Sequence, residues 1–272
     1  MITVACRLAK DRLGLTGLAI TSILLAVAVF APLLAPYDPT EMNLANRLQG
    51  VSMAHWMGTD AFGRDVLSRV IYGSRVSLTT TLAVMALTSG LGALIGGMAG
   101  YLGGAMDELV MRVIDILLAF PKLILALVIV AILGPSMINV VIAMLATGWV
   151  GYCRVVRGSV LSAKQKEFVE AARAIGCSGP RILLRHVMPE VIGPVVVLAT
   201  LDIGHIVLSI AALNFLGLGA QPPTPEWGAM LNEGIPFMES APHLMLFPGL
   251  LIMLTVLGFN LLGDALRDVL GA

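Results

Sequence analysis

The sequence has few charged residues and no excess of either sign. Only 12% of its 272 residues are charged, whereas 58% are hydrophobic, and the mean hydropathy is +0.93. A soluble domain carries about twice that charged fraction, so the apolar surface of this chain requires a bilayer as its solvent. Basic and acidic residues number 17 each, which leaves no basic surface for nucleic acid.

Two further absences exclude classes of activity. The three cysteines, Cys6, Cys153 and Cys177, match no spacing of a metal motif, and we interpret them as free thiols. No Gly-Lys-Ser or Gly-Lys-Thr occurs in the chain, so it lacks the loop that cradles nucleotide phosphates. If ATP drives a process in which this chain takes part, the ATPase must be another polypeptide.

Long uncharged runs predict an all-α protein with six transmembrane helices in a single domain, residues 1–272. A run of about 20 residues is long enough to cross the hydrocarbon core, and Gly134-Pro135-Ser136 divides one longer run into two. The expected spans are residues 13–35, 76–106, 111–133, 137–153, 187–215 and 244–262. An even number of spans places both termini on the same side of the membrane.

Basic residues flank these spans unequally. Arg7, Lys10 and Arg12 precede the first span, and seven more lie between the fourth and fifth, so that 12 occupy one side and 4 the other. The side rich in Lys and Arg is cytoplasmic in most membrane proteins, which predicts cytoplasmic termini, an extracytoplasmic connection at 37–75 and a cytoplasmic loop at 161–186. The first uncharged run exceeds the 7–15 residues of a signal-peptide core, and we expect it to be retained.

The cytoplasmic loop contains a short polar segment, residues 167–176, that reads Glu-Phe-Val-Glu-Ala-Ala-Arg-Ala-Ile-Gly. Glu, Ala and Arg favour a helix, and Gly176 is a natural stop. A short rigid helix outside the bilayer could act as a lever that tilts the attached spans when a partner grips it. A solvated helical linker is the alternative interpretation.

Glu170-Ala171-Ala172, followed by Gly176 and Pro189, resembles the EAA loop of ABC importer permeases. Residues 58–69, 215–228 and 260–268 resemble segments of the oligopeptide, dipeptide and nickel permease group, and together they point to the "C" permease of the pair. The resemblance covers nearly the whole chain.

The resemblance implies a non-catalytic permease subunit in the bacterial inner membrane. It also implies a second homologous permease subunit, two ATPase subunits that bind ATP and Mg, and an extracytoplasmic substrate-binding protein, with membrane lipid around the spans and no cofactor in this subunit. The loop would form the coupling helix that docks into a groove of the ATPase. The coupling residues by this resemblance are Glu167, Glu170, Ala171, Ala172, Gly176 and Pro189.

Asp202 and His205 lie within the fifth expected span, three residues apart and therefore close on one helix face. Ionisable groups at membrane depth are costly and usually face a cavity or each other. They are candidates for the substrate pathway, and a structural Asp–His pair is the alternative. Two possible ligands from one helix cannot fill a metal shell, so no metal site is assigned.

The sequence around Asp202 and His205 is more similar to the nickel permease than to the dipeptide permease. We therefore expect import of nickel, free or chelated, with dipeptides or oligopeptides as the alternative. An ion-coupled secondary carrier would work without an ATPase and would leave the EAA-like loop unexplained. A membrane-embedded enzyme would need a metal triad or nucleophile motif, and we find neither beside these two residues.

Other polar residues have weaker interpretations. Lys122 and Asp115 lie about two helical turns apart and could face the bundle interior together, although Lys122 could also reach an interface. Asp60, Arg64, Asp65 and Arg69 are expected to form surface ion pairs that orient an outer cap or meet a binding protein.

Two patterns of nonpolar residues also predict positions. Gly92, Gly96, Gly100 and Gly104 form one stripe on the second span, which favours close packing of a neighbouring helix. Trp227 is expected to anchor the chain at the outer membrane interface, where tryptophan is enriched.

Overall fold

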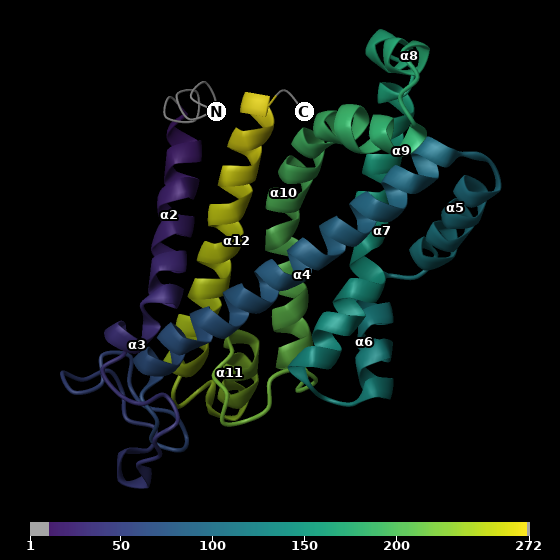
Figure 1. Ribbon diagram of the computed structural model, residues 1–272. Coiled ribbons are helices and arrows are strands. Elements are labelled where there is room, and N and C mark those ends of the chain that lie inside the picture. Colours follow the sequence, from purple (N-terminus) through teal and green to yellow (C-terminus); the bar gives the residue numbers. More distant parts are fainter. Residues whose placement is uncertain (1–10, 271–272) are drawn as a thin grey trace.

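The computed structural model describes residues 11–270, which form a bundle of long helices joined by loops (Figure 1). Arg7 and Lys10, which contribute to the expected orientation, and Cys6 lie outside the described residues. In chain order the helices are α2 (Arg12–Val29), α3 (Ala31–Leu34), η1 (Leu44–Asn46), α4 (Val66–Leu102), α5 (Gly104–Leu118), α6 (Lys122–Leu133), α7 (Met137–Ala163), α8 (Glu167–Ala174), α9 (Gly179–Ile182), η2 (Leu183–Val187), α10 (Met188–Phe215), α11 (Trp227–Gly234), η3 (Ile235–Phe237) and α12 (His243–Leu270).

The all-helical, polytopic fold predicted from the uncharged runs is confirmed. Within residues 11–270, five helical segments are long and apolar enough to cross a membrane, and the bent pair α5 and α6 brings the number to six. That pair corrects the expected single span at 111–133, because its two helices meet at an angle of 87°. Pro121 sits at the break with ψ 122°. Proline has no N–H to donate and pushes the residue before it out of the α region, so the helix cannot continue.

Helix α4 is longer than the span predicted from the uncharged run at residues 76–106. It begins at Val66, ten residues earlier than expected, where the side chain of Asp65 accepts a hydrogen bond from the backbone N–H of Ser68. Its 37 residues extend for about 55 Å, whereas the hydrocarbon core is about 30 Å thick. The helix accordingly crosses the bundle obliquely, and Figure 1 shows it lying across the other long helices.

Glycines on α4 allow the close approach of α7. A side chain at Gly92 would lie 2.5 Å from Cβ of Tyr152, and one at Gly100 would lie 3.0 Å from the carbonyl oxygen of Arg157. Gly96 likewise faces the backbone of Cys153. The predicted stripe is therefore a packing surface within the chain, except that Gly104 belongs to the start of α5 and faces no neighbouring atom within 4 Å.

The ends of the bundle differ in what they carry. At one end, which we call the α8 end, helix α8 stands beyond the bundle, and α2 begins and α12 ends there (Figure 1). At the opposite end, which we call the α11 end, lie α3, α11 and the loop that connects α3 to α4. The beginning of α2 and the end of α12 therefore share one side, as an even number of crossings requires.

Trp227, at the α11 end, corrects the expectation of an interfacial anchor. Its side chain is fully buried, at 0% exposed, and packs in a core cluster with Leu78, Val207 and Ile252. Its indole N–H donates to the carbonyl oxygen of Val70 at 3.1 Å. Because it is buried and its N–H is hydrogen-bonded, this residue holds α11 against the long helices.

Candidate functional site

Helix α8 presents an exposed surface at its end of the bundle. Glu167 and Glu170 lie in its first turn and Arg173 in its last, which complements the helix dipole. Val169 and Ala172 are buried against the bundle. The predicted coupling residues thus divide by position: those on the free face of α8 are Glu167, Glu170 and Ala171, whereas Ala172 faces inward.

Gly176 ends α8 through its backbone conformation. Its φ is +84°, a left-handed value that glycine adopts without steric cost. Its N–H donates to the carbonyl oxygen of Arg173 at 2.9 Å, and the next N–H, that of Cys177, donates to Ala172 at 3.0 Å. These two bonds form a Schellman motif. A side chain at Gly176 would meet no atom within 4 Å, so the requirement for glycine is conformational.

The loop after α8 leads directly into a long helix of the bundle. From Gly179 to Phe215 the helices α9, η2 and α10 form one continuous segment of 37 residues. Pro189 lies in the first turn of α10, directly after the π-helical turn η2, and it is not part of the free face of α8. A motion imposed on α8 is therefore transmitted to α10 through a short, helical connection.

Packing, rather than charge, holds α8 to the bundle. The buried cluster at this end joins α8 to α7 and α10 and contains Val156, Val160, Ala163, Val169, Ala172, Ile182, Val187 and Val191. An ion pair between Lys166 and Glu190 spans 2.5 Å, but both side chains are about half exposed. Exposed pairs contribute little, so the apolar cluster carries most of the attachment.

A second site lies where the break between α5 and α6 faces α7 and α10, and Phe120, Lys122 and Gly151 on its wall are exposed. It is a cavity of about 260 Å³. Three ionisable side chains contribute to its wall: Lys122 at the start of α6, Tyr152 on α7 and Asp202 on α10. The rest of the wall is mostly apolar.

The three polar residues lie near the middle of their membrane-spanning segments. At 1.5 Å per residue, Lys122 is about 16 Å along α6 from Leu133, and Asp202 is about 20 Å along α10 from Phe215. Tyr152 is about 22 Å along α7 from Met137. The three residues therefore lie ~16–22 Å along their helices from the ends nearest the α11 end, in segments that cross a core about 30 Å thick.

Asp202 and His205 do not form the expected pair. Tyr152 donates a hydrogen bond from its hydroxyl to Oδ2 of Asp202 at 3.0 Å, whereas His205 is exposed on the outside of α10. Asp115 is also exposed on α5, and the 87° break removes the two-turn relation to Lys122. In residues 11–270 no group of three or more His, Cys, Asp or Glu side chains is placed to hold a metal.

The polar residues at the α11 end form a buried network, which corrects the expected surface ion pairs. Arg64 and Arg69 are each 1% exposed. Arg64 donates to Asp60 and to Glu233 of α11, at 2.6 Å each, and Arg69 donates to the same Glu233 oxygen at 2.9 Å. The network therefore clamps the loop before α4 onto α11.

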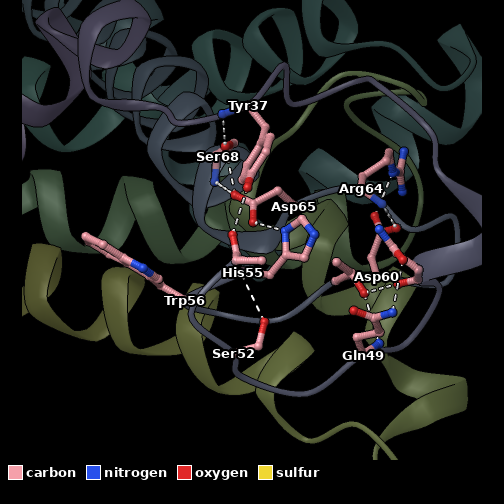
Figure 2. Close-up of polar contacts among 12 residues, drawn as sticks. Tyr37, Gln49, Ser52, His55, Trp56, Asp60, Arg64, Asp65 and Ser68 are labelled. Carbon is pink, nitrogen blue, oxygen red and sulfur yellow. Dashed lines mark hydrogen bonds and ion pairs between the residues drawn. The ribbon is translucent and has the colours of Figure 1, made fainter.

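A neighbouring set of hydrogen bonds fixes the start of α4 (Figure 2). Asp65 accepts from the N–H and the hydroxyl of Ser68 at 2.8 Å each, and it pairs with Nδ1 of His55 at 2.9 Å. The backbone N–H of Tyr37 donates to the hydroxyl oxygen of Ser68 at 3.1 Å. Trp56 points away from these contacts in Figure 2. These residues give the α11 end a rigid cap.

Glu226 caps the N-terminus of α11 from a buried position. One carboxylate oxygen accepts from the hydroxyl of Ser77 at 2.8 Å and the other accepts from the N–H of Ala229 at 2.9 Å. Burial raises the pKa of Glu226 to about 7, against the opposing effect of these hydrogen bonds. The sequence gives no local signal for this burial, because Ser77 lies 149 residues away.

Comparison with known families covers almost the whole chain. A family described as "Binding-protein-dependent transport system inner membrane component" matches residues 92–272, and one described as "N-terminal TM domain of oligopeptide transport permease C" matches residues 4–50. Members of the first family are transport subunits without a catalytic centre or cofactor of their own.

Individual relatives agree with this assignment. The dipeptide transport system permease protein DppC of Alkalihalophilus pseudofirmus is 48% identical over 266 residues, which cover 97% of this chain and 87% of that protein. The glutathione transport system permease protein GsiD of Escherichia coli and that of Shigella sonnei are each 46% identical over 265 residues, covering 97% of this chain and 88% of those proteins.

A solved structure shares the fold. An inward-facing conformation of the MetNI methionine ABC transporter matches with a TM-score of 0.53 at 20% identity, over 71% of this chain and 94% of that one. Identity at this level supports the fold alone. The two family matches and the relatives show that this chain is a multi-pass inner membrane permease subunit of the oligopeptide permease C type, belonging to the family of inner membrane components of binding-protein-dependent transport systems.

Proposed function

We propose that this chain is one of two membrane-spanning subunits of an ABC importer for small peptides, such as dipeptides or glutathione. The observation that carries the proposal is the cavity at the α5–α6 break, because Lys122, Tyr152 and Asp202 line it together in helices long enough to cross a membrane. A transport pathway must offer polar groups at that depth. The relatives named for dipeptide and glutathione transport support the same class of substrate.

Peptides fit this cavity better than nickel, the substrate expected from the Asp202–His205 neighbourhood. The ammonium group of Lys122 in the wall opposes a bare divalent cation. Asp202 and His205 point to different surroundings, and residues 11–270 hold no cluster of three metal-binding side chains. The nickel interpretation also receives no support from the names of the reported relatives.

The same proposal assigns the partners and the orientation. The free face of α8, with Glu167, Glu170 and Ala171, would dock on an ATPase subunit, so the α8 end and both termini would face the cytoplasm. The α11 end would then receive substrate from an extracytoplasmic binding protein. A second permease subunit would close the pathway against the exposed sides of α6 and α10, and two ATPase subunits would bind ATP and Mg.

Coupled transport would follow from rigid-body motion. ATP binding would close the ATPases on each other and move α8, and the continuous helix from Gly179 to Phe215 would carry that motion into the membrane. Gly176 would keep α8 at a fixed angle, while Pro189 would lie at the junction between η2 and α10.

Uptake measurements test this proposal directly. Cells that express the complete transporter would be given labelled dipeptide, labelled glutathione or labelled nickel, and a matched strain would carry an ATPase subunit unable to hydrolyse ATP. We expect ATP-dependent uptake of at least one peptide and none of nickel. Nickel uptake without peptide uptake would restore the nickel interpretation, and peptide uptake unaffected by the defective ATPase would indicate an ion-coupled carrier.

A further inference from the structure

We infer that the cavity at the α5–α6 break is a subsite for the charged termini of a peptide, in which Lys122 binds a carboxylate and Asp202 binds an ammonium group. This inference rests on the proposed function and adds the chemical groups that the subsite recognises.

The first argument is that both charges lack a protein counter-ion. In the part of the chain that the structure describes, neither Lys122 nor Asp202 belongs to an ion pair. Oδ2 of Asp202 accepts one hydrogen bond, from Tyr152, at 3.0 Å. Ionised side chains at membrane depth are expensive without a partner. A zwitterionic peptide supplies one group of each sign and would satisfy both.

The second argument is the position of Lys122 at a helix N-terminus. Helix α6 starts at Lys122 and has no side-chain cap. Its first N–H groups therefore have no partner within the helix, and they carry the positive end of the helix dipole. Phe120, Lys122 and Leu125 all line the cavity. The start of α6 and the ammonium group of Lys122 therefore both favour an anion in the part of the cavity next to them.

The third argument is the shape of the cavity. Gly151 lines it, and a side chain at that position would meet no atom within 4 Å. The volume of about 260 Å³ is near the lower end of small-molecule pockets, which suits the end of a peptide. Leu117, Val150 and Leu198 supply apolar wall for one side chain of any kind. Such a wall favours recognition of the termini over recognition of a particular side chain.

The test compares two substrates in the same membranes. Uptake of a labelled dipeptide and of its C-terminal amide would be measured for wild type, Lys122→Met and Lys122→Arg, and expressed as the ratio of the two rates. The ratio cancels differences in folding and abundance, and the binding protein is the same throughout. We expect Lys122→Met to lower the ratio about tenfold, since a charge-assisted hydrogen bond is lost, and Lys122→Arg to stay within about threefold of wild type.

A double variant separates substrate binding from a structural ion pair. If Lys122 and Asp202 served each other in another conformation, Lys122→Met with Asp202→Asn would recover dipeptide uptake, because no charge would be left unpaired. If both bind substrate, the double variant should transport no faster than the weaker single variant. This comparison uses only the unmodified dipeptide, so it decides the question even where the amide is not transported.

A steric pair of variants tests the cavity itself. Gly151→Leu should fill it and lower dipeptide uptake about tenfold, whereas Gly158→Leu should not. Both glycines are exposed on the same helix, α7, and neither has an atom within 4 Å of where its side chain would begin.

The outcomes distinguish the inference from the proposed function. A wild-type transporter that takes up no peptide would refute both. Peptide uptake by wild type, with an unchanged ratio in Lys122→Met or with recovery in the double variant, would overturn the subsite and leave the proposed function standing. Equal uptake by Gly151→Leu and Gly158→Leu would also overturn it.

Discussion

Replacing Gly176 should weaken the link between ATP hydrolysis and transport in a graded way. Gly176 has a φ of +84°, and a residue with a Cβ pays about 1–2 kcal/mol in that region. No atom lies within 4 Å of the position its Cβ would take, so a clash adds nothing to this cost. Asparagine tolerates the conformation better than alanine, and β-branched valine tolerates it worst.

The cost is large compared with the stability of α8. A helix of eight residues is not stable alone in water, and only Val169 and Ala172 are buried from it. A loss of about 1–2 kcal/mol lowers the ratio of the ordered to the disordered loop by about 5- to 30-fold. We therefore expect coupled uptake to fall in the order wild type, Gly176→Asn, Gly176→Ala, Gly176→Val.

The assay would use the complete transporter in proteoliposomes, with ATP hydrolysis and dipeptide uptake measured on the same preparation. Gly158→Ala and Gly193→Ala are matched controls, because their side chains would also meet open space and their φ is not positive. Uptake in Gly176→Val equal to that of the two controls would refute the argument that the left-handed turn orders α8.

Three further predictions concern stability, measured as the free energy of unfolding or the melting temperature of the purified complex. Arg64→Met should cost about 3–5 kcal/mol, since Asp60 and Glu233 lose a buried partner. Glu226→Gln should make the free energy of unfolding less dependent on pH. Burial raises the pKa of Glu226 from the ordinary 4.5 to about 7, so the folded wild-type protein binds a proton more tightly than the unfolded chain. Wild type therefore loses about 3 kcal/mol of stability as pH rises from about 4.5 to 7. Gly92→Val should cost at least about 1–3 kcal/mol, because α7 lies where the side chain would go.

Each of these has a control nearby in the chain. Arg75→Met on α4 removes an exposed arginine, Glu239→Gln removes an exposed carboxylate after α11, and Gly90→Val enters open space on α4. All three should change stability by less than about 0.5 kcal/mol, apart from a small gain at position 90, where valine has a higher helix propensity than glycine. If a test variant behaves like its control, the burial argument for that residue is wrong.

The uncharged runs predicted the bundle because a bilayer demands apolar length, but they misjudged where helices end. Arg69 interrupts the apolar pattern, yet it lies inside α4 since Asp60 and Glu233 neutralise it. The prediction of a single third span was wrong for a local reason that is visible in the sequence. Pro121 breaks the helix, but the prediction was based on charge, and the pattern of charged residues does not mark this break.

In the candidate sites, the features that could be predicted depend on residues close together in the sequence, and those that could not depend on residues far apart. The helix of the EAA-like loop and its stop at Gly176 depend on neighbouring residues, so they could be predicted. The surroundings of Asp202 could not, because Tyr152 reaches it from another helix 50 residues away. Helical spacing alone suggested His205 as its partner, but Asp202 lines the cavity whereas His205 is exposed and does not. Trp227 was misplaced because composition cannot distinguish a buried tryptophan from an interfacial one.

In the transport cycle proposed above, the position of Asp202 along α10 would matter mechanically. Asp202 lies about 20 Å from both Met188 and Phe215, the two ends of α10. A tilt of ~10° about that midpoint would move each end by ~3.5 Å at a rise of 1.5 Å per residue, in opposite directions, and leave Asp202 almost still. In the proposed cycle, such a tilt would widen one end of the pathway and narrow the other, while the residues at the pivot kept their geometry. A subsite at the pivot can hold its cargo unchanged while the membrane side it faces is reversed.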